Sequence, residues 1–189
     1  MHYQDIYQQI EKTVFKEPIL QTPTQKLLGL SKKLDNTLYI KREDMQDVFS
    51  FKIRGAFHKM SLLSDSEKKR GVITASAGNH AQGVALGARH LGIKASIVMP
   101  TTTPSIKVEA VKAFGAKVIL FGDNYDAACE HTKEIIKKTG EVFIHPFDDP
   151  YTIAGQGTVG KEILETNNDL DAIFVPVGGG GLLAGVGAW

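Results

Sequence analysis

Residues 72–80 read Val72-Ile73-Thr74-Ala75-Ser76-Ala77-Gly78-Asn79-His80, and residues 81–91 continue with apolar residues at helical spacing. The β-branched apolar residues at the start are typical of a buried strand, and the small residues with glycine are typical of a tight turn. The stretch therefore predicts a strand that passes through a glycine turn into a helix.

Strand-like runs of this kind recur along the chain at regular intervals. They begin at residues 72, 95, 117 and 142, in steps of 23, 22 and 25 residues, and helical spacing fills the intervals at 81–91, 106–114 and 125–138. Because a strand plus a crossover helix takes a step of that size, the pattern predicts a parallel α/β sheet with right-handed crossovers.

Two further apolar runs, at residues 38–40 and 172–177, lie outside this repeating block. We predict that they are strands of a second sheet in a larger, partial domain formed by residues 1–53 and 147–189, with a smaller α/β domain, 54–146, inserted between them. The expected architecture is two three-layer α/β/α domains with parallel sheets, and a cleft between domains is a common place for a ligand. Residues 3–16 predict a polar surface helix.

The last part of the sequence is uncharged from residue 172 to residue 189, which is long enough to suggest a membrane span. Pro176 and four consecutive glycines are poorly suited to a lipid-exposed helix, so the stretch favours a buried strand, a loop and a helix. The apolar final residues, 181–189, have no polar face and no stop signal, which predicts that the sequence is part of a longer protein.

The composition excludes several classes of function. The 22 basic and 21 acidic residues leave a net charge of +1, which argues against nucleic acid as the main partner. A single cysteine, Cys129, excludes a disulfide framework and favours a reducing, cytoplasmic location. The histidines show no pair at ligand spacing, so no metal site is predicted.

The first candidate site is Ser50-Phe51-Lys52-Ile53-Arg54-Gly55-Ala56. Ser50 is predicted to cap the helix that follows, which places Lys52 in the first turn, at the positive end of the helix dipole. That position lowers the pKa of the amine and suits a lysine that must lose its proton to react with a carbonyl. Spacing alone favours an ordinary exposed helix lysine.

The second candidate is the turn at residues 76–80, because a helix N-terminus offers free backbone N–H groups to an anion. Ser76 and Asn79 add side-chain donors, and a carboxylate would fit. A plain turn, with Ser76 or Asn79 as the helix cap, explains these residues equally well.

The third candidate is the run of four glycines at residues 178–181, whose backbone can close around a phosphate. Gly179 and Gly181 also fit a dinucleotide fingerprint loosely, which keeps a nicotinamide-dependent oxidoreductase open. Residues 155–161 resemble a P-loop, but Glu162 stands where serine or threonine must bind magnesium, so we predict a helix there.

Together these motifs resemble the threonine dehydratases, pyridoxal-phosphate (PLP) enzymes of the tryptophan-synthase-β fold type. The three motifs occur in the family's order, and Lys41-Arg42-Glu43-Asp44, Val98-Met99-Pro100 and residues 154–158 extend the resemblance from about Leu20 to Trp189. Residues 41–44 and 71–75 are more similar to the biosynthetic, isoleucine-pathway branch than to the catabolic one.

The resemblance implies a role for each site residue. Lys52 would be the catalytic residue and hold PLP covalently, Phe51 would lie against the pyridine ring, and Asn79 would hydrogen-bond the ring hydroxyl. The phosphate would be bound by Gly178, Gly179, Gly180, Gly181 and Leu182. The substrate carboxylate would be bound by Ser76, Ala77, Gly78, Asn79 and His80.

The activity implied is the PLP-dependent elimination of L-threonine, and of L-serine, to a keto acid and ammonia, as the first step of isoleucine biosynthesis. The family's enzymes are cytoplasmic homo-oligomers, tetramers when full-length, and the biosynthetic ones carry a C-terminal allosteric domain that this sequence lacks. Ala77 stands where related serine racemases have a serine opposite the lysine, which predicts elimination without racemisation. The alternatives are a catabolic dehydratase of the same family, the oxidoreductase, and an inactive fragment with a binding or regulatory role.

Overall fold

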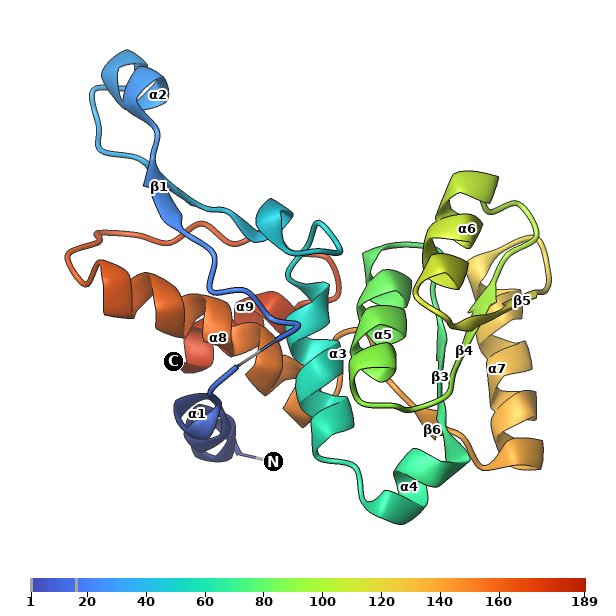
Figure 1. The fold of residues 1–189 in the computed structure, drawn as a ribbon. Helices are drawn as coiled ribbons and strands as arrows, with labels where there is room; N and C mark the ends of the chain where they lie inside the picture. Colours follow the sequence, from blue (N-terminus) through green and yellow to red (C-terminus); the bar gives the residue numbers. More distant parts are fainter. Residues whose placement is uncertain (1, 16) are drawn as a thin grey trace.

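The computed structural model describes residues 2–15 and 17–189. It contains one parallel sheet with the strand order β5-β4-β3-β6 (Figure 1). The strands are β3 (Val72–Ala75), β4 (Ala95–Met99), β5 (Lys117–Leu120) and β6 (Val142–Phe143). All four begin at the predicted residues, which confirms the predicted parallel α/β class.

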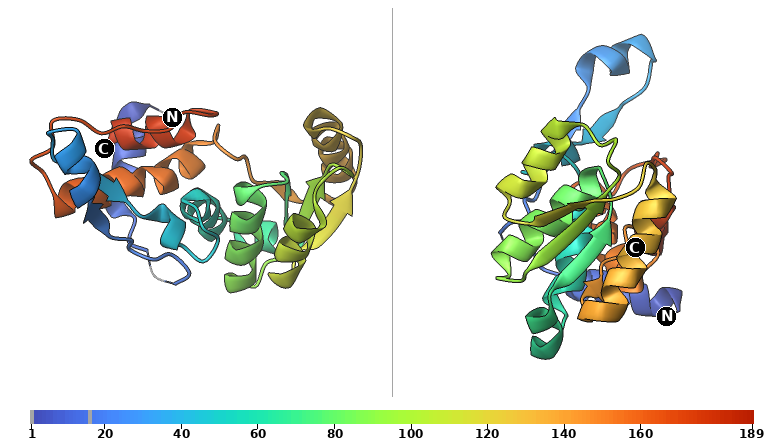
Figure 2. Two further views of the ribbon diagram at one scale, coloured as in Figure 1. Left: turned by 90° about the horizontal axis from the view of Figure 1, so that it is seen from above. Right: turned by 90° about the vertical axis from the view of Figure 1, so that its right-hand side faces the viewer.

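Helices cover both faces of the sheet. Successive side chains of a strand point to opposite faces, so the apolar residues of these strands need cover on both. Val72, Ile97 and Met99 pack with α5 (Asn79–His90) and α6 (Ser105–Ala113). Ile73 and Val98 pack with α7 (Tyr125–Thr139). The right-hand view of Figure 2 shows α5 and α6 on one side of the strands and α7 on the other.

A layer of helices lies beside this unit. It consists of α1 (Tyr3–Lys12), α3 (Lys52–Ser61), α8 (Pro150–Thr166) and α9 (Gly181–Ala188), while the short α4 (Asp65–Arg70) leads into β3. Asp149 caps α8 by accepting the N–H groups of Tyr151 and Thr152, both at 3.0 Å. Residues 155–161 lie inside α8, so the rejection of a P-loop is confirmed. Helix α1 ends at Lys12, and position 16 of the predicted helix lies outside the described residues.

The predicted second parallel sheet is wrong for the described residues. The run at 38–40 does form a strand, β2 (Tyr39–Lys41), but β2 pairs antiparallel with β1 (Thr24–Lys26), and α2 (Leu28–Lys33) lies between them. Figure 1 shows this segment as an arm that projects from the body. Residues 172–177 form no strand, and Phe174 is 93% exposed, because an apolar run becomes a strand only beside a strand that can pair with it. The division into domains at residues 54 and 146 stays a prediction.

Within the part of the chain that the structure describes, no helix is both long enough and apolar enough to cross a membrane.

Candidate active site

The carboxyl ends of β3 and β6 bring two loops together. The two strands are parallel neighbours, with Val72 opposite Val142, so the segments that follow them, 76–80 and 144–147, meet at one edge of the sheet. The order of the strands also reverses here, because β4 lies on one side of β3 and β6 lies on the other. Open α/β sheets bind ligands at such switch points.

A cavity of about 510 Å³ lies at this edge. It is lined by Lys52, Ala75, Ser76, Gly78, Asn79, His80, Lys107, Tyr125, Pro146 and Phe147. The lining includes two lysines and no carboxylate, so the cavity is electrostatically suited to an anion. Of the predicted site residues, Lys52, Ser76, Gly78, Asn79 and His80 are thus brought together, whereas Phe51, Ala77 and the glycine loop are not among the lining residues.

Lys52 is the first residue of α3, and its Nζ donates to the carbonyl oxygen of Pro146 at 2.8 Å. Burial lowers the pKa of Lys52, so the predicted direction holds, although the prediction gave the helix dipole as the cause. The centre of the Phe51 ring lies 5.4 Å from the Lys52 Nζ. The predicted cap is wrong: Phe51, with helical backbone angles, occupies the N-cap position, and the buried Ser50 hydroxyl has no hydrogen-bond partner among the described residues.

The turn at residues 76–80 leaves the first N–H groups of α5 without a side-chain cap. Gly78 occupies the N-cap position, and the Ser76 hydroxyl accepts the N–H of Gly78 at 3.3 Å. Neither Ser76 nor Asn79 caps the helix, so the turn differs from a plain capped βα loop. Its N–H groups stay available to an anion at the positive end of the α5 dipole.

His80 joins the two loops of the site. Its Nε2 lies 2.9 Å from the carbonyl oxygen of Ile144, which can only accept, so the proton is on Nε2. The Thr74 hydroxyl donates to the same oxygen at 2.9 Å. Burial lowers the pKa of His80 to about 3, so the imidazole is neutral and contributes no positive charge to the cavity.

The glycine loop reaches the cavity through Phe147. A Cβ on Gly181 would stand 2.7 Å from the carbonyl oxygen of Phe147, and one on Gly179 would run into the Phe147 ring. Gly178 and Gly180 have no atom within 4 Å of where a Cβ would stand, and Gly180 has a φ of 85°. The loop therefore borders open space on one side and packs tightly on Phe147 on the other.

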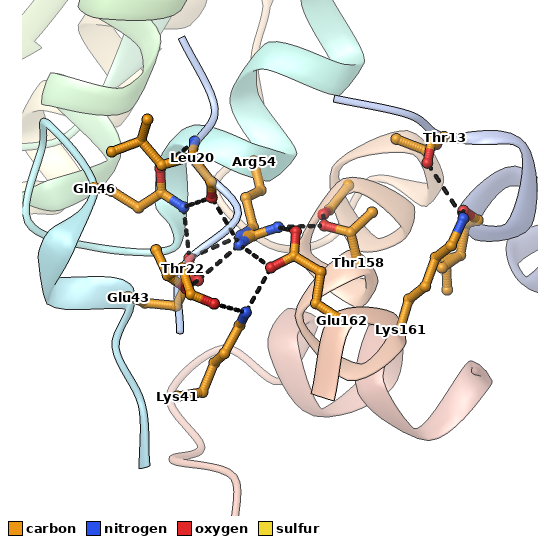
Figure 3. Close-up of polar contacts among 12 residues, drawn as sticks. Thr13, Leu20, Thr22, Lys41, Glu43, Gln46, Arg54, Thr158, Lys161 and Glu162 are labelled. Atoms are coloured by element: carbon orange, nitrogen blue, oxygen red, sulfur yellow. Dashed lines mark hydrogen bonds and ion pairs between the residues drawn. The ribbon is translucent and has the colours of Figure 1, made fainter. Parts of the chain in front are cut away.

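A buried ion cluster fixes α3 to its surroundings (Figure 3). Arg54, whose side chain is completely buried, donates to both Glu43 oxygens at 2.7 Å and to the Glu162 oxygens at 2.5 and 2.8 Å. Lys41 also donates to Glu162, at 2.5 Å. Because Glu43 lies in the 3₁₀ helix η1 (Glu43–Met45) and Glu162 lies in α8, the cluster ties two separate segments to the helix that begins with Lys52.

Five residues of the cavity wall were not predicted as site residues, and one of them, Ala75, is the last residue of strand β3. Pro146 and Phe147 follow β6 as the turn at 76–80 follows β3, so the parallel-strand pattern contained the signal for them. Lys107 and Tyr125 come from α6 and α7 and carry no motif. Burial, followed by a hydrogen bond with Cys129, raises the pKa of Tyr125 to about 12, so its hydroxyl keeps its proton.

Comparisons with known proteins agree with this arrangement. The pattern of the family described as "Pyridoxal-phosphate dependent enzyme" matches residues 15–189. The threonine dehydratase of Nicotiana attenuata is 58% identical over 170 residues, which are 90% of this chain and 28% of that protein.

Solved structures give the same result. The processed form of threonine deaminase isoform 2 from Solanum lycopersicum matches with a TM-score of 0.95 at 50% identity, over 98% of this chain and 51% of that one. Maize serine racemase matches with a TM-score of 0.88 at 38% identity, over 97% of this chain and 54% of that one. The predicted tryptophan-synthase-β-like fold class is thereby confirmed, and this chain belongs to the family of pyridoxal-phosphate dependent enzymes.

Proposed function

We propose that this chain forms the cofactor- and substrate-binding part of a biosynthetic threonine dehydratase, which converts L-threonine to 2-oxobutanoate and ammonia. The observation that carries the proposal is the Lys52 amine, half-buried in an acid-free cavity beside the uncapped N-terminus of α5. The sequence identity to threonine dehydratases supports the choice of substrate. The chain spans only about a third of the length of these relatives, and the activity proposed is that of the whole protein.

The residues present fit pyridoxal phosphate. An aldehyde needs an amine that readily loses its proton, and Lys52 offers one with a lowered pKa. A phosphate needs a backbone cradle, and the open space at Gly178 and Gly180 provides it at the N-terminus of α9. When bound, the cofactor supplies an electron sink for negative charge at the substrate Cα.

The protein side of the reaction is binding, orientation and proton transfer. Lys52 holds the cofactor and, once its amine is free, Nζ takes the Cα proton of the substrate. Ser76, Asn79 and the N–H groups of α5 hold the substrate carboxylate. Ala77 brings no acidic group to that turn, which supports elimination of the β-hydroxyl over return of a proton to the other face.

The test begins with an absorbance spectrum of the chain after addition of pyridoxal phosphate. We expect an absorbance band from the covalent adduct that borohydride bleaches, and a mass increase of one pyridoxyl group. The whole protein should then form keto acid from L-threonine with no D-allothreonine in the remaining substrate. Binding of a nicotinamide dinucleotide without uptake of pyridoxal phosphate would instead favour the oxidoreductase.

A side chain at Gly179 is expected to weaken cofactor binding through Phe147. In Gly179→Ala the new Cβ collides with the Phe147 ring, close to the root of that side chain, so the loop must move. The affinity for pyridoxal phosphate, measured by absorbance titration, should fall about tenfold to hundredfold. Gly179→Ala with Phe147→Leu should recover most of the loss, and Phe147→Leu alone is the control. If the double variant binds pyridoxal phosphate no better than Gly179→Ala does, the added methyl group acts directly on the phosphate and not through Phe147.

We also infer, from the resemblance to threonine dehydratases, that the whole protein is a cytoplasmic homo-oligomer under allosteric control by isoleucine. The same resemblance supports residues 54–146 as a domain inserted into a larger one, and all four strands of the parallel sheet fall within that range. Analytical ultracentrifugation of the whole protein with and without isoleucine tests the first of these inferences.

A further inference from the structure

Helices α3 and α5 lie side by side and run in the same direction (Figure 1). Gly83 of α5 faces the start of α3, and Gly87, one turn later, faces Phe57 and Met60. Because positions 79, 83 and 87 are spaced by four residues, Asn79, Gly83 and Gly87 share one face of α5. The same face thus includes a residue of the cavity wall and the contact with α3.

The contact at Gly83 is with main chain. A Cβ there would stand 3.0 Å from the nitrogen of Ile53, 3.1 Å from the carbonyl carbon of Lys52 and 3.2 Å from the Ile53 Cα. These atoms form the peptide bond that follows Lys52, and a peptide bond cannot rotate aside as a side chain can. A methyl group at Gly83 therefore requires the first turn of α3 to shift by a few tenths of an ångström.

Helix α3 has no free space on its other side. A Cβ on Gly55 would stand 2.7 Å from the carbonyl oxygen of Thr152 in α8, and one on Gly155 of α8 would stand 2.5 Å from the carbonyl oxygen of Arg54. The ion cluster of Arg54 fixes the same segment. A push from α5 is therefore resisted by α8, and the strain falls on the first turn, at Lys52.

We propose that Gly83 is a positioning residue, whose missing side chain sets the distance between the Lys52 amine and the turn at residues 76–80. The proposal rests on the proposed function, because it assumes that Lys52 holds the cofactor. Gly83 is not among the residues that line the cavity. It acts through the peptide bond of Lys52.

The test compares Gly83→Ala with Gly87→Ala in the whole protein to which this chain belongs. Both changes add one methyl group to the same face of the same helix, and alanine is the better helix former at both positions. At Gly87 the methyl group meets the flexible end of Met60, 2.7 Å from its Cε, far along the helix from Lys52. We expect both variants to unfold cooperatively on heating.

The readout is the affinity for two aldehydes, pyridoxal phosphate and phosphate-free pyridoxal, measured by absorbance titration and borohydride trapping. The affinity of Gly83→Ala should fall about tenfold for both aldehydes, because the binding of both depends on the position of the Lys52 amine. The affinities of Gly87→Ala should stay within about twofold of those of the wild type. An equal loss in the two variants would overturn the proposal, as would a loss confined to pyridoxal phosphate or a Gly83→Ala chain that no longer folds. If the wild-type chain itself carries no pyridoxyl group on Lys52, the proposed function fails instead.

Discussion

Replacing Lys52 by alanine is expected to abolish covalent attachment of pyridoxal phosphate. Two other lysines close to α3 or on it are engaged in ion pairs, Lys41 with Glu162 at 2.5 Å and Lys59 with Asp149 at 2.9 Å. Burial lowers the pKa of Lys52, so at neutral pH a larger fraction of the molecules has this lysine as the unprotonated, nucleophilic amine. Affinity measured by absorbance titration should fall about a hundredfold or more, and mass spectrometry after borohydride reduction should find no pyridoxyl group.

Two lysines serve as controls for this result. Lys59→Ala removes an amine from the same helix but outside the cavity, and we expect normal attachment at Lys52. Lys107→Ala removes the second amine of the cavity wall, and it should leave the pyridoxyl group on the Lys52 peptide. A pyridoxyl group found on Lys107 in the wild-type protein would contradict the assignment of Lys52.

Replacing Arg54 by methionine is expected to lower the free energy of unfolding by about 3–5 kcal/mol, a large part of the about 5–15 kcal/mol typical of a domain. Without the guanidinium, two largely buried carboxylates, Glu43 and Glu162, share a single positive charge. That charge is on Lys41, which pairs with Glu162 and not with Glu43. Unfolding in urea, followed by circular dichroism, measures the loss. Arg42→Met is the matched control, because Arg42 pairs with Asp44 at the surface and should change little.

The cluster also predicts how the chain responds to acid. Burial is the largest single influence on the pKa of Glu43 and acts to raise it. The hydrogen bonds and positive charge of Arg54, together with hydrogen bonds from Thr22 and Gln46, outweigh burial, so the pKa lies below its ordinary value of 4.5. A carboxyl group with a lowered pKa adds stability that is complete at pH values above its ordinary pKa and is lost as the pH falls through its pKa in the folded chain.

A double variant tests whether unpaired charge causes the loss in Arg54→Met. Adding Glu43→Gln removes one of the unpaired carboxylates and should recover part of the free energy of unfolding at neutral pH. If the double variant is no more stable, unpaired charge is not the cause of the loss.

The sequence predicted the sheet well because strand periodicity is a local signal. Each of the four strands starts at the predicted residue, since β-branched runs and glycine turns specify a strand wherever neighbours are available. Residues 172–177 are also apolar and rich in β-branched residues, apart from Pro176, and form no strand, because pairing depends on a partner that composition does not reveal. Ser50 failed as a cap for a related reason: helical backbone at Phe51 moved the cap position by one residue.

The site could be predicted only where chemistry and sequence motif coincide. Lys52 and the turn at 76–80 lie on motifs, and the cavity brings them together. Arg54 carries the largest ion cluster, yet an arginine in a helix gives no sign in the sequence that it is buried. Lys107 and Tyr125 reach the cavity only because α6 and α7 fold over the end of the sheet.

The pairing of β6 with β3 also has a consequence for how the chain acquires its cavity during synthesis. Strands β3, β4 and β5 follow one another closely, but Val142 must return to Val72 after 70 residues, and β6 has only two residues to hold it. Closing so long a loop for so few contacts is entropically costly, so this pairing is expected to form after the rest of the sheet. Pulse-labelled hydrogen exchange would then protect the amide of Val142 later than that of Ile97. A nascent chain could thus display a nearly complete sheet on the ribosome and still have no place to capture its cofactor.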